Sequence, residues 1–424
     1  MAADVRSLFD LPEFRPYQTR YLARRQTFVT RHHYYKGTIY QDSAFRIAHK
    51  LYAATKALFL PLARAVDLDV ALIPGMGDPW ALDEAATDAQ RAAQGLLYTW
   101  SQWATVGDTW LEDGAKLGEA LLKVVAVAPG AVALQRLDPT IGMLTRAVDE
   151  TGQTVDMLII ADPEAEDAGG ERYEYGEVIT PSLVRTYRNG EPFGYDGQPE
   201  RWENPLGFVP VVQVLNDARG EPTFAKCQPQ LDAVNELASY LADIIGRHAE
   251  PQWAITGAEQ GELTKSGQNV WFLPAGAKIE AILAQIDVAG TLAFIQAVGS
   301  EMKGGLPELA FDDLRAKDQI ATETLRVQLI ELEAKIWKMR RRYDAALVQA
   351  HQMAALTASI YGIAGLEPLL EPHSLDGRRP ILPPSRMEEI ALEQAELALE
   401  AQRAMASGDG LTATAVRDTD AVQG

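Results

Sequence analysis

The longest periodic pattern in the sequence predicts one helix of about 40 residues in the last third of the chain. Its apolar positions, which step by four and three residues, are Leu325, Leu329, Leu332, Ile336, Met339, Tyr343, Leu347 and Ala350. At about 1.5 Å per residue, such a helix is roughly 60 Å long. A helix of this length needs other elements, or other subunits, to brace it. The rest of the chain must therefore supply its packing partners.

A second helix is predicted from Leu231 to Ala249, and it has an acidic face. At about 100° per residue, Asp232, Glu236 and Asp243 share one narrow sector, and leucine and isoleucine side chains occupy the opposite side. The helix should end near Ala249, because Pro251 restricts the residue before it and cannot donate to a helix ladder.

Short strands follow this helix, and another helix follows the strands. The segments QWAIT and NVWFLP are expected to be strands, separated by turns at Gly257 and Gly261 and followed by a glycine turn at 275–277. Apolar residues at spacings of four and three then predict a helix over Asp287–Lys303, which a break at Gly304, Gly305 and Pro307 ends. Because the β module is too small to be stable alone, the two helices are expected to carry it away from the main body.

The remaining segments predict an α+β protein. Helices are expected over residues 10–30, with Gly37 closing that region, over Asp42–Ala65, and over Leu82–Glu112, where three tryptophans form one apolar face. From Ala120 to about Asn216, short β-branched segments separated by turn residues indicate an antiparallel sheet with hairpins, and PEAEDAGGE is expected to be an exposed acidic loop. After a proline-rich stretch, a capping box with Ser385 and Glu388 predicts a helix to about Ala406, and the last residues should be frayed.

The charge balance excludes one class of protein. The chain has 39 Lys and Arg residues against 59 Asp and Glu residues, a net charge of −20. A protein that binds DNA tightly through counterion release needs a basic face. An acidic surface suits either a polyanion that must slide past or ordinary solubility. The single cysteine, Cys227, excludes an internal disulfide and is expected to be a half-buried thiol. No apolar run approaches the roughly 20 residues that span a bilayer, so we expect a soluble protein made in a cytoplasm.

No catalytic or cofactor motif is present. The sequence lacks the phosphate-binding, dinucleotide-binding, nucleophile-elbow and CxxC patterns. His32 and His33 have no neighbouring ligand cluster, and Glu308 with Asp312 and Asp313 is expected to be solvated rather than bound to a metal. We therefore expect no enzyme activity, no cofactor and no metal.

One dense basic cluster lies on the long helix, in the segment KIWKMRRR. Its members are Lys335, Lys338, Arg340, Arg341 and Arg342. The cluster is interpreted as a solvated or intersubunit charged face, with nucleic-acid binding as the weaker alternative.

The order of these segments resembles the portal proteins of tailed double-stranded DNA bacteriophages, particularly long-tailed phages of actinobacteria. The resemblance is carried by YYKG, NPLGFVPVVQVLN, LDAVNELASYLADII running into EPQWAITG, IDVAGTLAFIQAVGSEMKGGLPE, and TETLRVQLIELEAKI, in that order over most of the chain. One departure is IATETLR, with Thr322 and Thr324 where the family often has a serine-serine or serine-glycine run.

The resemblance implies a portal-type fold assembled as a ring, usually a dodecamer, at one capsid vertex, through which DNA is packaged and ejected. It implies a mixed wing (1–225), a first stem helix (226–250), a small α/β clip (251–286), a second stem helix (287–303), a tunnel loop (304–320), a long wing helix (321–366) and a crown with the C-terminal tail (367–424). Implied partners are other copies of the chain, the major capsid protein, the terminase large subunit, head-to-tail connector proteins, and double-stranded DNA that passes through the channel without sequence-specific contacts. No membrane partner is implied, and the implied location is the virion.

The same resemblance, joined to the acidic face, assigns candidate site residues. Asp232, Glu236 and Asp243 are expected to line the DNA channel and to repel the duplex. The alternative is that these acids pair with neighbouring subunits. The tunnel loop would contribute Lys303, Glu308, Asp312, Asp313, Arg315 and Lys317, and the clip would present Glu259, Glu262, Lys265 and Trp271 to terminase or connector proteins. Rival interpretations are another ring-forming or coiled-coil assembly protein without a DNA channel and, more remotely, a metal-dependent nuclease.

Overall fold

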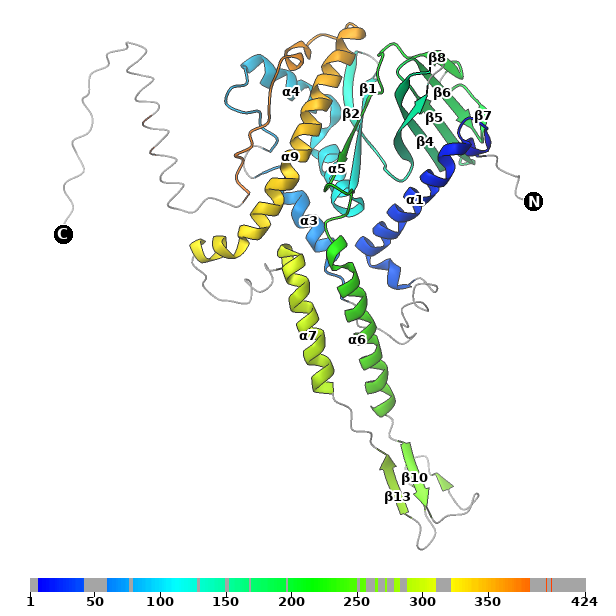
Figure 1. Ribbon diagram of the computed structural model, residues 1–424, viewed down its shortest axis with the longest axis vertical. Helices are drawn as coiled ribbons and strands as arrows, with labels where there is room; N and C mark the ends of the chain where they lie inside the picture. The colour runs from blue at the N-terminus through cyan, green and yellow to red at the C-terminus, as the bar shows by residue number, and fades with distance from the viewer. Residues whose placement is uncertain are drawn as a thin grey trace, which may run out of the picture.

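A computed structural model shows a broad α+β body from which a two-helix stalk projects, with a small β tip at its far end (Figure 1). It describes residues 7–41, 59–75, 79–127, 130–148, 152–167, 169–195, 197–249, 252–256, 264–265, 271–272, 278–282, 288–309 and 322–381, with positions 394 and 398. Below, "stalk" means helices α6 and α7, "tip" means strands β10 to β13, and "body" means the other described elements.

The N-terminal helices form part of the body. After the short η1 (Leu8–Asp10), α1 runs over Arg15–Lys36 and ends, as predicted, at Gly37, whose φ of 68° is the left-handed conformation that glycine adopts readily. The short η2 (Thr38–Gln41) follows. The next described helix, α3 (Leu62–Leu72), continues seven residues beyond Ala65, so that predicted end is wrong. The rest of that predicted region, 42–58, lies outside the described residues.

The predicted helix over Leu82–Glu112 is two helices. These are α4 (Asp88–Ser101) and α5 (Trp103–Leu117), and Gln102 between them has a φ of 51°. A left-handed residue interrupts the helical hydrogen-bond ladder, so the chain changes direction there. The tryptophan face was predicted correctly as core, since Trp103 and Trp110 are buried and Trp100 packs against the same cluster.

The β region forms two antiparallel sheets rather than the one predicted. The first has the order β2-β1-β9, built from β1 (Glu119–Val127), β2 (Ala131–Leu137) and β9 (Val211–Leu215). The second has the order β3-β4-β5-β6-β7, with β8 also paired to β6. Its strands are β3 (Gly142–Val148), β4 (Thr154–Glu166), β5 (Arg172–Ile179), β6 (Leu183–Arg188), β7 (Glu191–Pro192) and β8 (Arg201–Glu203). The predicted acidic loop is partly strand, because β4 extends to Glu166.

The long helix, α9 (Thr322–Ile360), has 39 residues and packs against the first sheet and helices α4 and α5. Trp110 meets Tyr343 edge to face, with 5.2 Å between the ring centroids, in the largest apolar cluster of the body. The predicted need for bracing is therefore met within the chain for the C-terminal part of α9. The short η5 (Glu367–Leu370) and the segment to Ile381 then return over the body, where Leu375 bridges to Leu82.

The stalk confirms both predicted helices. After η3 (Ala225–Cys227), α6 covers Gln228–Ala249, and α7 covers Val288–Gly305, so Gly304 and Gly305 close the helix rather than follow it. The helices pack through small and apolar side chains, including Val234, Ala238, Ile295 and Met302. The short η4 (Pro307–Leu309) then leads from the stalk into the body.

The tip contains two pairs of short strands. β10 (Gln252–Thr256) was predicted, and its partner is β13 (Lys278–Ile282), which was not. β11 (Thr264–Lys265) pairs with β12 (Trp271–Phe272), which falls within the predicted strand NVWFLP. The predicted C-terminal helix and tail lie outside the described residues, apart from helical positions 394 and 398. None of the described helices combines the length and apolarity that crossing a bilayer requires.

Candidate functional site

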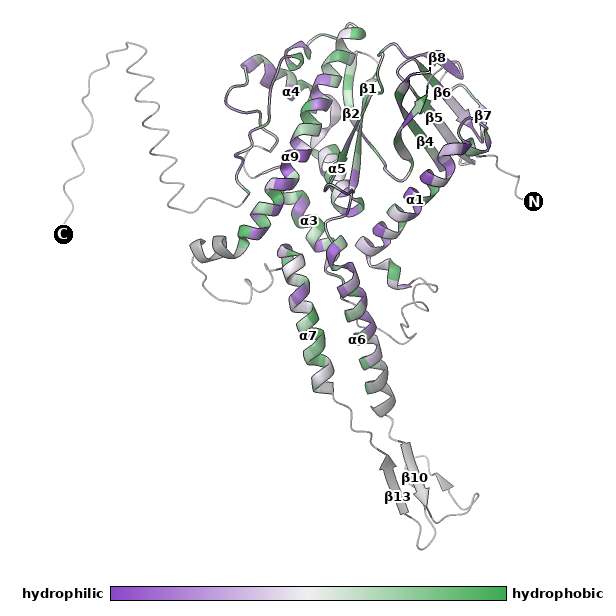
Figure 2. Cartoon of the chain, viewed as in Figure 1, coloured by the Kyte–Doolittle hydropathy of each residue, from purple (hydrophilic) through white to green (hydrophobic). Residues whose placement is uncertain are grey.

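Helix α7 is unusual because it is uncharged over most of its length. Between Val288 and Ser300 it carries no Asp, Glu, Lys or Arg. Ile295 and Met302 are buried against α6 and the body, whereas Leu292 and Phe294 are 47% and 57% exposed. Figure 2 shows the apolar colour along α7 on a stalk that stands clear of the body. Large apolar side chains exposed together on one element commonly mark a surface that contacts another protein.

The same apolar character continues around the stalk. On α6, Tyr240 and Ile245 are half exposed. Where the stalk meets the body, Phe59 and Leu60 border an apolar groove of about 430 Å³ that Val234 and Met302 also line. One copy of the chain therefore leaves a large part of the stalk's apolar surface open to water.

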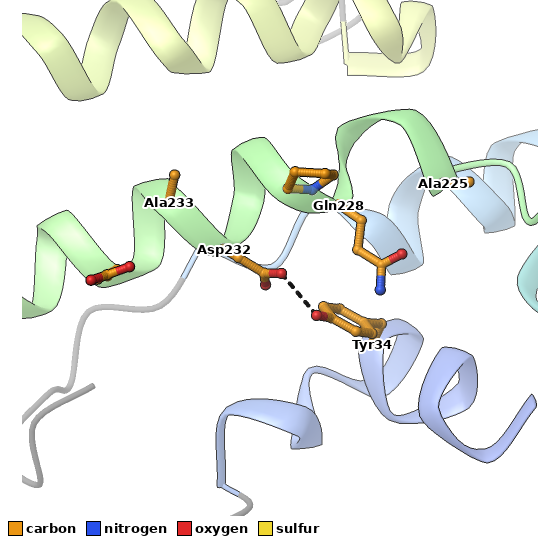
Figure 3. A pocket seen from close by; sticks show the side chains of 7 residues that line it. Tyr34, Ala225, Gln228, Asp232 and Ala233 are labelled. Carbon is orange, nitrogen blue, oxygen red and sulfur yellow. Dashed lines mark hydrogen bonds between the residues drawn. The ribbon is translucent and has the colours of Figure 1, made fainter. Parts of the chain in front are cut away.

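The acidic face of α6 lies partly against the body. Asp232 and Glu236 line a pocket of about 390 Å³ together with Gln228 and, from α1, Tyr34 (Figure 3). The Tyr34 and Tyr40 hydroxyls donate to the two carboxylate oxygens of Asp232, at 2.8 and 2.9 Å. Burial, followed by the charge of Asp232, raises the pKa of both tyrosines, so both stay protonated donors.

The predicted acidic stripe is therefore not uniform. Asp232 accepts hydrogen bonds from α1 and η2 of its own chain, a partner set that the sequence did not predict. Glu236 is half-buried at the rim of the same pocket, and the side chain of Asp243 lies outside the described residues. The channel-lining role of these acids stays a prediction.

Asn235 provides a second attachment of α6 to the body. Its fully buried side chain accepts a hydrogen bond from the Phe59 amide at 2.8 Å and donates to the Phe59 carbonyl at 3.3 Å. Sequence reasoning missed Asn235 and the two tyrosines. Asn235 lies between Leu231 and Ala238 on the apolar side of α6, and a polar residue at such a position indicates a buried hydrogen bond. Nothing near Tyr34 or Tyr40 in the sequence indicated a contact with Asp232.

The basic cluster of α9 is divided between the interior and the surface, which corrects its interpretation as one charged face. Arg340 is 1% exposed and donates to the carbonyls of Ile73, Leu72 and Arg379 at 2.9, 3.0 and 2.6 Å. Lys335 forms ion pairs inside the protein with Glu308 and Asp69. Arg342 is half-buried, so of the five residues only Lys338 and Arg341 are exposed.

Glu308 also differs from its prediction. It lies in η4 with its side chain fully buried, so it is not a solvated loop residue beside Asp312 and Asp313. The burial follows from the adjacent Leu306 and Leu309, which anchor this turn in the core. Other predicted tunnel-loop and clip residues lie outside the described residues, or have side chains that do: Lys303, Asp312, Asp313, Arg315, Lys317, Glu259, Glu262, Lys265 and Trp271.

The residues considered for metal or thiol chemistry have ordinary structural roles. His33 bonds to the Thr38 hydroxyl at 2.7 Å through Nδ1, and the His32 ring lies beside Tyr35. Cys227 is buried more fully than predicted, and its thiol donates to the Met302 carbonyl at 3.5 Å. Across the described part of the chain, no three His, Cys, Asp or Glu side chains gather as a metal-binding group.

Comparisons with known proteins give only distant likenesses. No protein-family model matches the chain, and no curated protein matches it significantly. Among solved structures, a chain in the neck of an empty gene transfer agent particle is similar at 13% identity, covering 83% of this chain and 87% of that one, with a TM-score of 0.45. A chain in the virion of a native gene transfer agent particle has 15% identity, the same coverages and a TM-score of 0.40. A chain in the neck of the native particle has 15% identity over 70% and 77% of the two chains, with a TM-score of 0.39.

Proposed function

We propose that this chain is a portal protein: copies assemble into a ring, usually of twelve, whose stalks surround a channel for double-stranded DNA at one vertex of a phage capsid. The observation that carries the proposal is the uncharged helix α7, which exposes Leu292 and Phe294 on a stalk away from the body. This surface needs a partner of the same length and polarity, and the stalk of a second copy provides one.

In the proposed ring, the stalk of the next copy covers the exposed side of α7. In a head-to-tail contact, one lateral face of each copy meets the opposite face of the next, and the contact repeats until the ring closes. Fully burying a leucine or phenylalanine side chain stabilises by about 1.5–3 kcal/mol. Since about half of each side chain is exposed, covering Leu292 and Phe294 contributes roughly 1 kcal/mol each per copy, repeated around the ring.

The charge of the chain suits a channel that does not retain DNA. With a net charge of −20, an acidic bore repels the phosphate backbone and leaves the duplex free to slide. In this proposal Glu236 and Asp243 are the lining charges, while Asp232 attaches the stalk to the body. The role is structural rather than catalytic.

The tip is the part of the chain positioned to meet other proteins. Strands β10 to β13 lie at the far end of the stalk, away from the body (Figure 1). In this proposal they contact the terminase during packaging and the head-to-tail connector proteins afterwards. The body would be the wing that the major capsid protein surrounds, with α9 as its long helix.

Assembly is tested with the purified full chain. Mass photometry should show a closed assembly whose mass is a whole multiple of 46.4 kDa, and negative-stain images should show rings with an open centre wide enough for a duplex. Monomers at all concentrations would contradict the proposal. Rings with a closed centre would favour the alternative of an assembly protein without a DNA channel.

The channel is tested by reversing its charge. Glu236→Lys with Asp243→Lys should leave ring assembly intact but slow or stall packaging, because a basic bore attracts the phosphates. Glu331→Lys, on the exposed surface of α9, is the matched control and should package normally. Unchanged packaged DNA length and rate in the stalk variant would exclude a lining role for these acids.

A further inference from the structure

Three charged side chains meet in the interior where the stalk joins the body. Asp69 of α3 and Glu308 of η4 both have fully buried side chains. The Lys335 Nζ of α9 lies 3.3 Å from Asp69 Oδ2 and pairs closely with Glu308 Oε1. The Thr223 hydroxyl, from the segment before α6, also donates to Asp69 Oδ2. Four separate parts of the chain therefore converge on this cluster.

The cluster has one acidic group too many. Two carboxylates against one ammonium would leave a net negative charge in the interior, which is costly without further hydrogen bonds. Among the described residues, moreover, Asp69 Oδ1 and Glu308 Oε2 are buried without a hydrogen-bond donor. A single proton on this pair of carboxyl groups neutralises the excess charge and supplies a donor, which two carboxylates lack.

We propose that Asp69 and Glu308 share one proton at neutral pH, with Asp69 as the donor, and that this proton-dependent contact fixes the end of α7 to the body. The reasoning does not depend on the assembly proposed above. It requires only that the two carboxyl groups and Lys335 stay together in the interior.

The electrostatic surroundings agree with this assignment. Burial raises the pKa of Asp69 to about 8, and the charge of Glu308 and a hydrogen bond between the two carboxyl groups add to the effect of burial, whereas Lys335 and Thr223 oppose it. Burial lowers the pKa of Lys335, but the two carboxyl groups outweigh this and raise it overall. Other titratable groups around the cluster are Tyr343, which is affected by the charge of Asp69, and Cys227, which is affected by the charges of Lys335, Glu308 and Lys226. Burial raises the pKa values of Tyr343 and Cys227, so both stay neutral.

This contact attaches the end of α7 to the body. Glu308 lies in η4, three residues after α7 ends at Gly305. The Leu306 amide bonds to the Met302 carbonyl of α7, and the Leu309 amide bonds to the Leu306 carbonyl, so η4 continues directly from the helix. Loss of the proton leaves two carboxylates facing each other, and their repulsion pushes η4 away from α3. The end of α7 should then loosen before the rest of the body.

The first experiment detects the proton directly. Infrared spectra of the full chain at pH 6.5 and 9.5 should show the carbonyl band of a protonated carboxyl group at the lower pH only. Glu308→Gln and Asp69→Asn should each abolish this band, because the amide supplies the hydrogen bond and Lys335 neutralises the remaining carboxylate. Glu301→Gln, which removes an exposed acid of α7 shortly before η4, should retain it. No protonated band in the native chain, or a band that survives both amide variants, would overturn the proposal.

The second experiment measures the linkage to folding. A raised pKa for Asp69 makes the folded state bind a proton that the unfolded state has released, so the stability that this contact contributes is complete below about pH 4 and is lost as the pH rises to about 8. Between pH 5 and 7, the unfolding equilibrium constant of the native chain relative to Glu308→Gln should rise about tenfold per pH unit. The ratio of the unfolding equilibrium constants of the native chain and Glu301→Gln should not change with pH. A ratio to Glu308→Gln that is independent of pH would contradict a shared proton.

Discussion

Replacing Arg340 should destabilise the protein far more than replacing its neighbour Arg341. The Arg340 guanidinium donates to three carbonyls, of which Leu72 and Ile73 close the C-terminal end of α3. Burial, then the neighbouring Arg379, lowers its pKa to about 10, which leaves it charged at neutral pH. Its positive charge therefore complements the end of the α3 dipole as well as its free carbonyls.

The magnitude follows from the carbonyls left without a donor. Arg340→Met keeps the length and the apolar packing but removes the donors that Arg340 supplies to the three carbonyls. At the lower end of the about 1–3 kcal/mol that an unsatisfied buried group costs, three carbonyls give a loss of about 3 kcal/mol. This corresponds to a rise of more than about a hundredfold in the unfolding equilibrium constant. Arg340→Lys should be intermediate, because one ammonium cannot reach all three carbonyls.

The assay is urea unfolding followed by the fluorescence of the buried tryptophans near α9. Arg340→Met should shift the midpoint strongly without changing the slope, and exposed Arg341→Met should change stability by less than about 0.5 kcal/mol. Similar losses in the two methionine variants would refute the reasoning, since they would mean that the basic cluster acts as one surface rather than as separate interior and exterior groups.

Two further predictions concern packing and assembly. Gly114→Ala should destabilise the body by about 1–3 kcal/mol, because the added methyl group would collide with the buried Tyr343 hydroxyl. Gly95→Ala should instead stabilise the body by up to about 1 kcal/mol, because Gly95 lies in α4 with open space around it. Thermal unfolding midpoints that move in the same direction in the two variants would contradict this prediction. Phe294→Glu should shift the assembly towards smaller species in mass photometry, whereas Val148→Glu, at a more exposed residue on the body, should not. Equal effects of the two substitutions would exclude α7 from the contact between copies.

Much of the fold was predictable where a helix has a strong period and a clear stop signal. Helix α1 ends at Gly37, α6 ends before Pro251, and α9 follows its apolar pattern over 39 residues. These signals are local, since they depend on residues three or four apart and on backbone restrictions of glycine and proline. The break at Gln102 had no such signal, because glutamine seldom adopts a positive φ and the surrounding core imposes it.

The candidate site was less predictable because its contacts join distant parts of the chain. Arg340 bonds to carbonyls that precede it by 267 and 268 residues, and Tyr34 reaches Asp232 across 198 residues. Composition and spacing assigned Arg340 and Asp232 to charged faces, and only the fold shows that both have hydrogen-bond partners within the chain. The pairing of β10 with β13 was missed for the same reason, since a short strand carries too little pattern to identify its partner.

A cryo-electron microscopy map of the purified assembly tests the central proposal most directly. We expect a closed ring in which the α7 surface carrying Leu292 and Phe294 is covered by the next copy and the stalks surround a continuous bore. The bore should be wide enough for a DNA duplex and should be lined by the acids of α6. A ring whose stalks point away from a common axis, a blocked bore, or stalk surfaces that stay exposed to solvent would contradict the account.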